Sequence, residues 1–471
     1  MATKSPLGPR EAKGAGPGGF LDRYFKISER RSSLRTEIIA GFATWLTMAY
    51  ILFVNPSILG LGGEGLPFDQ VLAVTALTAG VMTLAMGLFA NYPFAIAAGL
   101  GLNAFVAFTL VLGFGLTFPQ AMGVIVIEGL VITVLVLTGV REAVLGAIPM
   151  DLKRAIGIGI GLFIAFIGLE TAGIVVHPEG GEPIVTLNRD LTTLRTLVFV
   201  IGLAATATLV SMRVRGALLI GIVATTVVAV VINEVWGAAA MWEAPGVATF
   251  PTDVVAMPDL SLLGAFSFDF FEVLGIGTAI AAVLSVMLSD FFDTVGTVVG
   301  LGGEAGFLDG QGRLPGVRRV LLVDSLAAAA GGAASASSNT TYIESAAGIS
   351  EGGRTGLVSV VVGVLFLLSL FFSPIAAVIP PEATAPVLII VGYFMMTLVR
   401  EIAWDDPGMG IPVLLTIGMM PFTFSITNGV AAGFIAYTAI SLLRGRWRDV
   451  HPLMFAVSVV FVWYFAEGLI P

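Results

Sequence analysis

Long apolar runs separated by short polar stretches make up most of this chain of 471 residues. A helix needs roughly 20 apolar residues to cross a hydrocarbon core about 30 Å thick. The first half of the chain has such runs near residues 35–59, 69–91, 95–113, 117–138, 152–175, 195–212 and 216–235. The second half has them near 272–300, 316–334, 341–350, 355–373, 381–400, 410–427 and 429–444. The pattern predicts an all-α polytopic membrane protein with 14 transmembrane segments.

Lys and Arg mark alternate connections between these runs. Arg23, Lys26 and Arg30 precede the first run, which predicts a cytoplasmic N-terminal segment over residues 1–34. The same rule places on the cytoplasmic side Lys153, Arg154, Arg213, Arg215, Arg313, Arg318, Arg319, Arg400, Arg444, Arg446 and Arg448. Seven spans per half satisfy every assignment, and an odd number of spans inserts the second half upside down relative to the first.

The two halves also share a weak sequence repeat. Ile148-Pro149 precedes one run, and Ile379-Pro380 precedes another run 231 residues later. The pairs that match at the same offset are Asp151 with Glu382, Gly161 with Gly392, and Phe163 with Phe394. We therefore predict two inverted seven-span repeats, an arrangement that places a transporter's substrate near mid-membrane. A further stretch, 452–470, is either a fifteenth crossing or a segment lying against the bundle.

Composition narrows the class of protein. Hydrophobic residues make up 57% of the chain and charged residues only 12%, whereas soluble domains carry about 25% charged residues. There are no cysteines and only two histidines, His177 and His451, each next to a proline. We therefore expect no catalytic residue, no metal, no cofactor and no nucleic-acid partner, and a membrane transporter in lipid rather than an enzyme.

Two segments in corresponding places of the halves are interrupted by small and polar residues. The third run contains Ala97 to Phe105, with Gly99, Gly101 and Asn103; the tenth contains Gly331 to Ser345, with Asn339 and Glu344. We expect short extended stretches in segments 3 and 10, each followed by a helix that starts inside the membrane. Close helix packing would explain the glycines alone. It does not explain the asparagines and Glu344.

Several acidic residues fall inside the predicted spans, where ionisable groups are costly and mark functional sites. Asp290, Asp293 and Thr297 share one face of the eighth span. Glu344 begins the helix of the tenth segment. No Lys or Arg is expected at comparable depth, so a carboxyl there can gain and lose a proton as a proton symporter requires. For Asp324 and Glu128 we favour a structural role, and for Asp290 both roles stay open.

At these positions the chain resembles the purine permeases of the azaguanine-resistance type, within the nucleobase–ascorbate transporter superfamily. The matching segments are Ala40 to Tyr50, Gly99 to Phe105, Asp290 to Thr297, Thr340 to Ile349 and Glu351 to Gly356. The resemblance covers the chain from about Phe25 to Arg448.

The resemblance implies a core domain and a gate domain that move against each other in an elevator-like motion, with homodimers formed through the gate. The implied core is 35–138 and 271–373, and the implied gate is 139–235 and 374–450. The remaining predicted parts are an extracellular or periplasmic connection at 236–270 and a C-terminal apolar segment at 451–471. The implied substrates are hypoxanthine, guanine and adenine, carried with protons across a bacterial inner membrane.

The implied proton-coupling acids are Glu344 and Asp293. Our candidate substrate-binding residues are Asp293, Glu344, Asn103, Thr341, Tyr342, Ile343, Thr297, Gly101 and Thr44, with Asp290, Asn339 and Asp324 in support. A uracil or xanthine carrier of the same superfamily is the alternative. A sulfate-type anion carrier of the same fold is disfavoured, because Asp293 and Glu344 would repel an anion.

Overall fold

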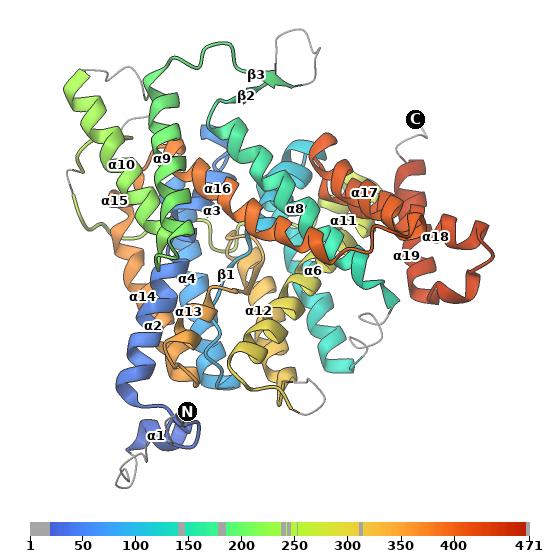
Figure 1. The fold of residues 1–471 in the computed structure, drawn as a ribbon, viewed down its shortest axis with the longest axis horizontal. Helices are drawn as coiled ribbons and strands as arrows, with labels where there is room; N and C mark the ends of the chain where they lie inside the picture. The colour runs from blue at the N-terminus through green and yellow to red at the C-terminus, as the bar shows by residue number, and fades with distance from the viewer. Residues whose placement is uncertain are drawn as a thin grey trace, which may run out of the picture.

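The computed structural model describes residues 19–139, 147–177, 185–236, 242, 246–251, 253–309 and 314–467, and in these ranges it is almost entirely helical (Figure 1). Ten described helices are long and apolar enough to cross a membrane, and three apolar helices are shorter. Most of the predicted N-terminal segment 1–34 and the end of the predicted 452–470 stretch lie outside the described residues.

The first half begins with a short helix, α1 (Phe20–Phe25). It continues with α2 (Leu34–Met48), α3 (Ile51–Leu59), α4 (Phe68–Ala85), β1 (Ile96–Ala98), α5 (Leu100–Ala104), α6 (Phe118–Thr138), α8 (Met150–Thr171), α9 (Leu194–Ser211) and α10 (Ala217–Trp236). A π-helical stretch, Phe105–Gly113, continues α5. Two short strands, β2 (Val175–Val176) and β3 (Thr186–Leu187), pair outside the bundle.

The second half comprises α11 (Phe270–Glu304), α12 (Val317–Ala333), β4 (Asn339–Thr341), α13 (Ser345–Ser350), α14 (Gly356–Ser369), α15 (Ser373–Ala377), α16 (Pro381–Met396), α17 (Pro407–Phe422), α18 (Ile426–Leu443) and α19 (Pro452–Glu467). Each of the 14 apolar runs corresponds to one of these elements or to consecutive ones, so the order of elements fits the predicted segments. The first run, for example, breaks at Ala49 and Tyr50 into α2 and α3.

Several of the described helices begin where a side chain caps their free N–H groups. Ser33, Thr193 and Ser425 each accept a hydrogen bond from the backbone three residues on. Thr117 and Gln120 form a capping box at the start of α6. These polar residues fix where the four helices begin.

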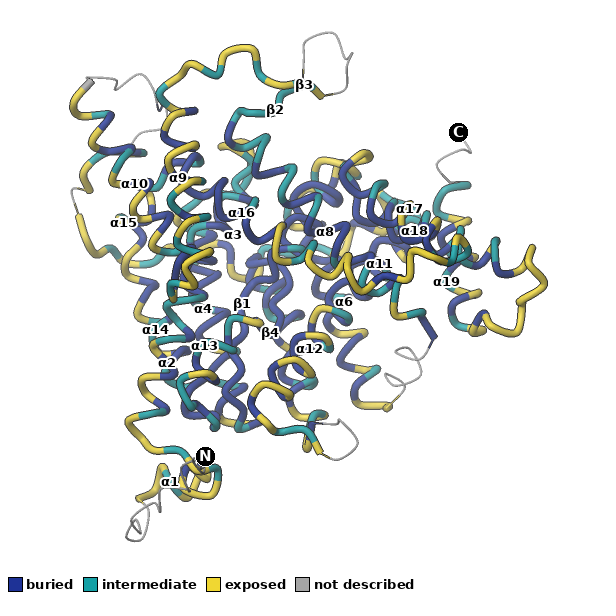
Figure 2. Tube along the Cα trace, in the orientation of Figure 1, coloured by how far each residue is buried: buried dark blue, intermediate teal, exposed yellow. Residues whose placement is uncertain are grey.

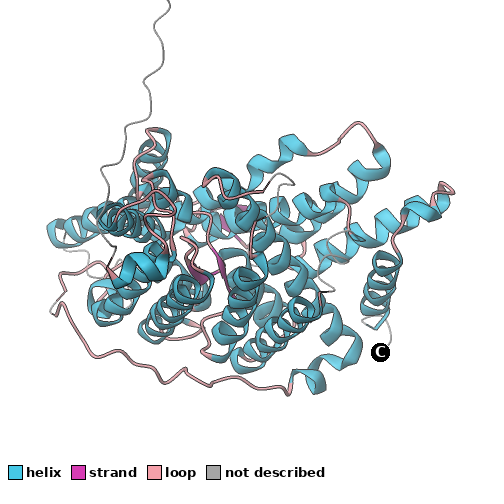
Figure 3. Cartoon of the chain, turned by 90° about the horizontal axis from the view of Figure 1, so that it is seen from below, coloured by secondary structure: helices cyan, strands magenta, loops and turns pink. Residues whose placement is uncertain are grey.

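The described elements form two groups by their contacts. In the first group α4 packs on α14, α6 packs on α12, and α11 packs on α6. In the second group α16 crosses α8, α9 packs on α10, and α17 packs on α18. Figure 3 shows the strands β1 and β4 surrounded by helices, and Figure 2 shows this centre as buried.

The crossing of α8 and α16 gives geometric support to the inverted repeat. A Cβ atom added at Gly161 would lie 2.9 Å from the carbonyl oxygen of Gly392, and one added at Gly392 would lie 2.4 Å from that of Gly161. The sequence repeat matches these two glycines. Reciprocal contact between matched residues is what a two-fold axis through the crossing produces.

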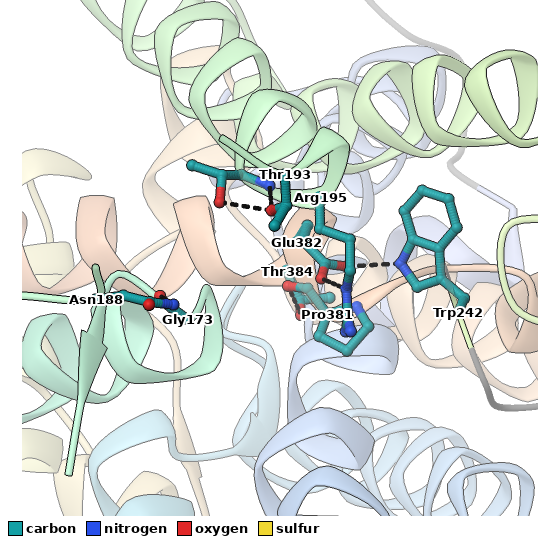
Figure 4. A network of polar contacts seen from close by, with 9 residues as sticks. Gly173, Asn188, Thr193, Arg195, Trp242, Pro381, Glu382 and Thr384 are labelled. Atoms are coloured by element: carbon teal, nitrogen blue, oxygen red, sulfur yellow. Dashed lines mark hydrogen bonds and ion pairs between the residues drawn. The ribbon is translucent and has the colours of Figure 1, made fainter. Parts of the chain in front are cut away.

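The matched acids at the starts of α8 and α16 both accept hydrogen bonds. Asp151 accepts one from Arg154 at 3.2 Å. Glu382, which is buried, accepts one from Arg195 Nε at 2.6 Å and one from Trp242 Nε1 at 2.9 Å (Figure 4). Each acid stands in the first turn of its helix, where negative charge is favourable.

The C-terminal stretch forms the helix α19, which lies against the bundle. It contacts both α18 and α11. Thr438 and Ser458 are hydrogen-bonded at 2.7 Å, and Tyr464 donates to Asn428 Oδ1 at 2.7 Å. Phe461 is fully buried, whereas Val459 and Val462 are exposed on the other side. Thus α19 has a protein-facing side and an apolar outward side.

Candidate functional site

The two interrupted segments meet at the centre of the molecule, as an antiparallel pair of strands. β1 pairs with β4 so that Ala97 lies opposite Thr340. Gly99 N–H donates to Ser338 O at 2.9 Å, and Tyr342 N–H donates to Ala95 O at 2.9 Å. These bonds satisfy the extended backbone, which membrane depth permits only where protein covers it. The predicted extended stretches in segments 3 and 10 are present.

Side chains from neighbouring helices complete the hydrogen bonding of β1. Thr83 of α4 accepts from Ile96 N–H and donates to Ile96 O, both at 2.9 Å. Ser345 of α13 accepts from Ala95 N–H at 2.9 Å. The strand is therefore held by both halves of the chain, and α13 begins directly beside it.

Glu344 immediately precedes α13 and meets the break between α2 and α3. Its Oε1 atom accepts a hydrogen bond from the Tyr50 hydroxyl at 2.6 Å. Thr47 of α2 also donates to the Glu344 carbonyl oxygen at 3.3 Å. The Tyr50 ring is buried and the Glu344 side chain is half-buried. Glu344 is thus a positioned carboxyl rather than an isolated one.

Asp293 lies on the side of α11 that faces open space. It is exposed, and a Cβ atom added at Gly296, one turn further along, would meet no atom within 4 Å. Its acidic neighbours are Asp324 and Glu344. Tyr50 and Tyr342 also lie within electrostatic range of both Asp293 and Glu344. The two predicted proton-coupling acids and two phenols therefore converge on one place.

Asp324 holds the end of β4 in position next to Asp293 and Glu344. Its Oδ1 atom accepts from Thr341 N–H at 2.8 Å and from Thr341 Oγ1 at 2.6 Å, and its Oδ2 atom accepts from Thr294 Oγ1 at 2.7 Å. The Thr341 hydroxyl, a candidate substrate contact, is thereby directed to Asp324 on α12. Through these hydrogen bonds Asp324 connects α11, α12 and β4.

The other residues of β4 and its continuation differ in exposure. The Tyr342 hydroxyl donates to the carbonyl oxygen of Ala98 on β1. Ile343 is 53% exposed, so its side chain borders open space next to Glu344. Ile343 could therefore contact a ligand directly, whereas Tyr342 links the two strands.

Asn103 and Asn339 are fully buried, and neither amide has a hydrogen-bond partner among the described residues. Buried polar groups are nearly always satisfied by protein or by a bound species. Asn103 lies on α5 directly after β1, and Asn339 lies on β4 opposite Ala98. The two asparagines singled out from the sequence are thus unsatisfied donors and acceptors at the two interrupted segments.

The remaining candidate substrate-binding residues lie in three different surroundings. A Cβ atom at Gly101 would lie 2.7 Å from Ile160 of α8, so Gly101 permits close contact between the two helix groups. Thr44 is buried on α2, with its hydroxyl beside Gly348 of α13. Thr297 is buried on α11, one turn from Asp293. The Thr44 hydroxyl has no hydrogen-bond partner among the described residues.

Two residues that were not among the predicted site residues lie beside the site in the structure. Tyr50 is the last residue of the matching segment Ala40 to Tyr50. A phenol inside a membrane span needs a hydrogen-bond partner, and this need could have indicated its role from the sequence. Lys153 of α8 lies over the ring of Phe292, with its Nζ atom 5.4 Å from the ring centroid. A cation therefore approaches the neighbour of Asp293, although the sequence indicated none at this depth.

Comparisons with known proteins identify the family of the chain. Residues 35–432 match the Permease family. The chain is 41% identical over 442 residues to a putative permease of Methanocaldococcus jannaschii, covering 94% of this chain and 97% of that protein. It is 39% identical to an adenine permease of Escherichia coli (94% and 95% covered) and 39% identical to a guanine/hypoxanthine permease of Bacillus subtilis (93% and 98% covered).

Solved structures share the fold at low sequence identity. The transmembrane domain of a cyanobacterial bicarbonate transporter, BicA, matches with a TM-score of 0.60 and 14% identity, covering 85% of this chain and 97% of that one. The murine Solute Carrier 26 family member A9 anion transporter, in the inward-facing state, matches with a TM-score of 0.60 and 11% identity, covering 93% and 74%. The chain is therefore a multi-pass membrane protein that belongs to the Permease family, as the resemblance in its motifs indicated.

Proposed function

We propose that the protein imports purine nucleobases by proton symport, with hypoxanthine, guanine and adenine as substrates. The observation that carries this proposal is the convergence of Asp293 and Glu344 beside paired, interrupted membrane segments. A purine edge presents N–H donors and ring-nitrogen acceptors side by side, and carboxyl groups can bind both kinds of atom as their protonation changes.

The unsatisfied amides of Asn103 and Asn339 support the same substrate. Each amide offers one acceptor oxygen and a donor nitrogen, which matches the alternating edge of a nucleobase. The adenine and guanine/hypoxanthine permeases related in sequence support the purine class. A uracil or xanthine carrier remains the alternative within the same superfamily.

An anion carrier is the competing class, because the structural relatives transport bicarbonate or are named as anion transporters. Those likenesses are 14% and 11% identical and concern the fold alone. An anion would meet Asp293, Asp324 and Glu344 as acidic neighbours here. The repulsion between like charges disfavours this function.

Transport would proceed by an elevator-like motion of the first helix group against the second. We assign residues 35–138 and 271–373 to the core and residues 139–235 and 374–450 to the gate. The Gly101 contact with Ile160 and the open side of α11 near Gly296 both lie at the core surface that would move. We further propose homodimers formed through the gate, in a bacterial inner membrane with the N-terminus in the cytoplasm.

The decisive experiment measures binding of hypoxanthine, guanine, adenine, xanthine, uracil and sulfate to purified protein at several pH values. We expect one or more of the three purines named above to bind, and Asp293→Ala and Glu344→Ala to lose that binding. Asp324→Asn serves as the matched control, since its amide oxygen can still accept from Thr341. Binding of uracil or sulfate instead, or binding that ignores both acids, would overturn the purine assignment.

A further inference from the structure

A second pair of acids lies between α6 and α11, away from the Glu344–Tyr50 contact. Glu128 of α6 is 0% exposed and Asp290 of α11 is 1% exposed. Their carboxyl groups lie within hydrogen-bonding reach of each other. The Ser338 hydroxyl lies 3.5 Å from Glu128 Oε2. Neither oxygen of Asp290, nor Oε1 of Glu128, has a donor among the described residues.

This arrangement requires a proton that no side chain supplies. An ionised carboxylate is an acceptor only, so two of them cannot hydrogen-bond to each other. When one carboxyl carries a proton, it donates to the other and satisfies two buried groups at once. Two full negative charges side by side in a water-poor interior would also repel strongly. The pair is therefore satisfied when it holds one proton and one negative charge.

Among the described residues, the charged groups that face the pair do not include a positive charge that could replace that proton. The charged groups that face the pair are Asp324 on α12 and Asp293 on α11, and both are acidic. The third acid is Glu344, which immediately precedes α13, and α13 packs against α11. On α8, which also contacts α11, Lys153 lies over the Phe292 ring.

We propose that Glu128 and Asp290 form a second proton-binding site, which takes up and releases one proton during transport. Two connections link this pair to the nucleobase site. Asp290 lies one helical turn before Asp293 on α11, and Ser338 immediately precedes β4, which leads to Glu344. Loading the pair forms one O–H bond and lowers its negative charge by one. This inference rests on the proposed proton symport, and it adds a second proton-binding site to the one formed by Asp293 and Glu344.

Glu128→Gln tests the pair, because the new amide donates permanently to Asp290 and takes the place of the proton. In proteoliposomes, nucleobase uptake by the parent protein should fall as pH rises. In Glu128→Gln the limiting slope of log uptake against pH should be shallower by about one proton. Equilibrium binding of the nucleobase to the purified variant should stay unchanged, since Glu128 does not contact the proposed site.

An infrared measurement provides a readout that does not depend on transport. The protonated carboxyl of the pair should give a carbonyl band that Glu128→Gln loses and Asp293→Asn retains. Asp290→Asn, which supplies the amide from the other side, is the second variant if Glu128→Gln does not fold. A parental pH slope in both variants, or a band unchanged by both, would overturn the inference. A parent protein without any proton-driven uptake would instead overturn the proposed function.

Discussion

At the scale of single residues, the site depends on hydrogen bonds that hold acids in place. Glu344 could have been a bare carboxyl at a helix start, but Tyr50 donates to it at 2.6 Å from the break between α2 and α3. Hydrogen bonds to a charged group are stronger than those between neutral groups. The phenol therefore fixes the orientation of the carboxylate that we assign to substrate and proton.

Replacing Tyr50 by Phe tests this positioning role. The variant keeps the buried ring but removes the donor to Glu344. Loss of a hydrogen bond to a charged group costs roughly 1.5–3 kcal/mol, so we expect nucleobase affinity to fall on the order of tenfold or more. Titration calorimetry on the purified variant measures this. Parental affinity together with an unchanged pH dependence of binding would show that Tyr50 does not position Glu344.

At the scale of elements, hydropathy and loop charge were enough to predict the order of the segments. The interruptions at Gly99 and Asn339 also followed from composition, because small and polar residues inside apolar runs are tolerated only in covered backbone. The pairing of β1 with β4 could not be predicted, since it brings together segments over 200 residues apart. Nor could the meeting of Glu128 with Asp290, which depends on how α6 packs on α11.

The last turn of α12, where it meets the chain that leads into β4, should be intolerant of added volume. A Cβ atom at Gly331 would lie 2.1 Å from the Ser337 carbonyl oxygen, a backbone atom that cannot move aside cheaply. Overpacking costs typically 1–3 kcal/mol. We therefore expect Gly331→Ala to lower the thermal unfolding temperature in detergent.

Gly296→Ala is the matched control, because a Cβ atom there meets nothing within 4 Å. It should unfold at the parental temperature or above, since alanine favours the helix. Equal unfolding temperatures for the two variants would mean that the close approach at Gly331 does not constrain β4.

At the scale of the whole molecule, polar contacts join the two helix groups that we assign to core and gate. Arg215, just before α10, forms an ion pair with Glu351, which follows α13. Arg215 is largely exposed, so such a pair contributes little stability and is easily broken. An elevator-like motion would have to break this contact in every cycle, whereas contacts within one group would persist.

The chain has no cysteine, so cross-linking can test the motion without background. In the double variant R215C/E351C, a short thiol-specific linker should stop nucleobase uptake, and reductive cleavage of the linker should restore it. The matched control is R444C/D406C, built on an ion pair of 3.0 Å between the ends of α18 and α17 in the second group. Linking that pair should leave uptake intact, because both residues would move as one body. Continued uptake by fully linked R215C/E351C protein would exclude relative motion at this contact and with it the proposed elevator.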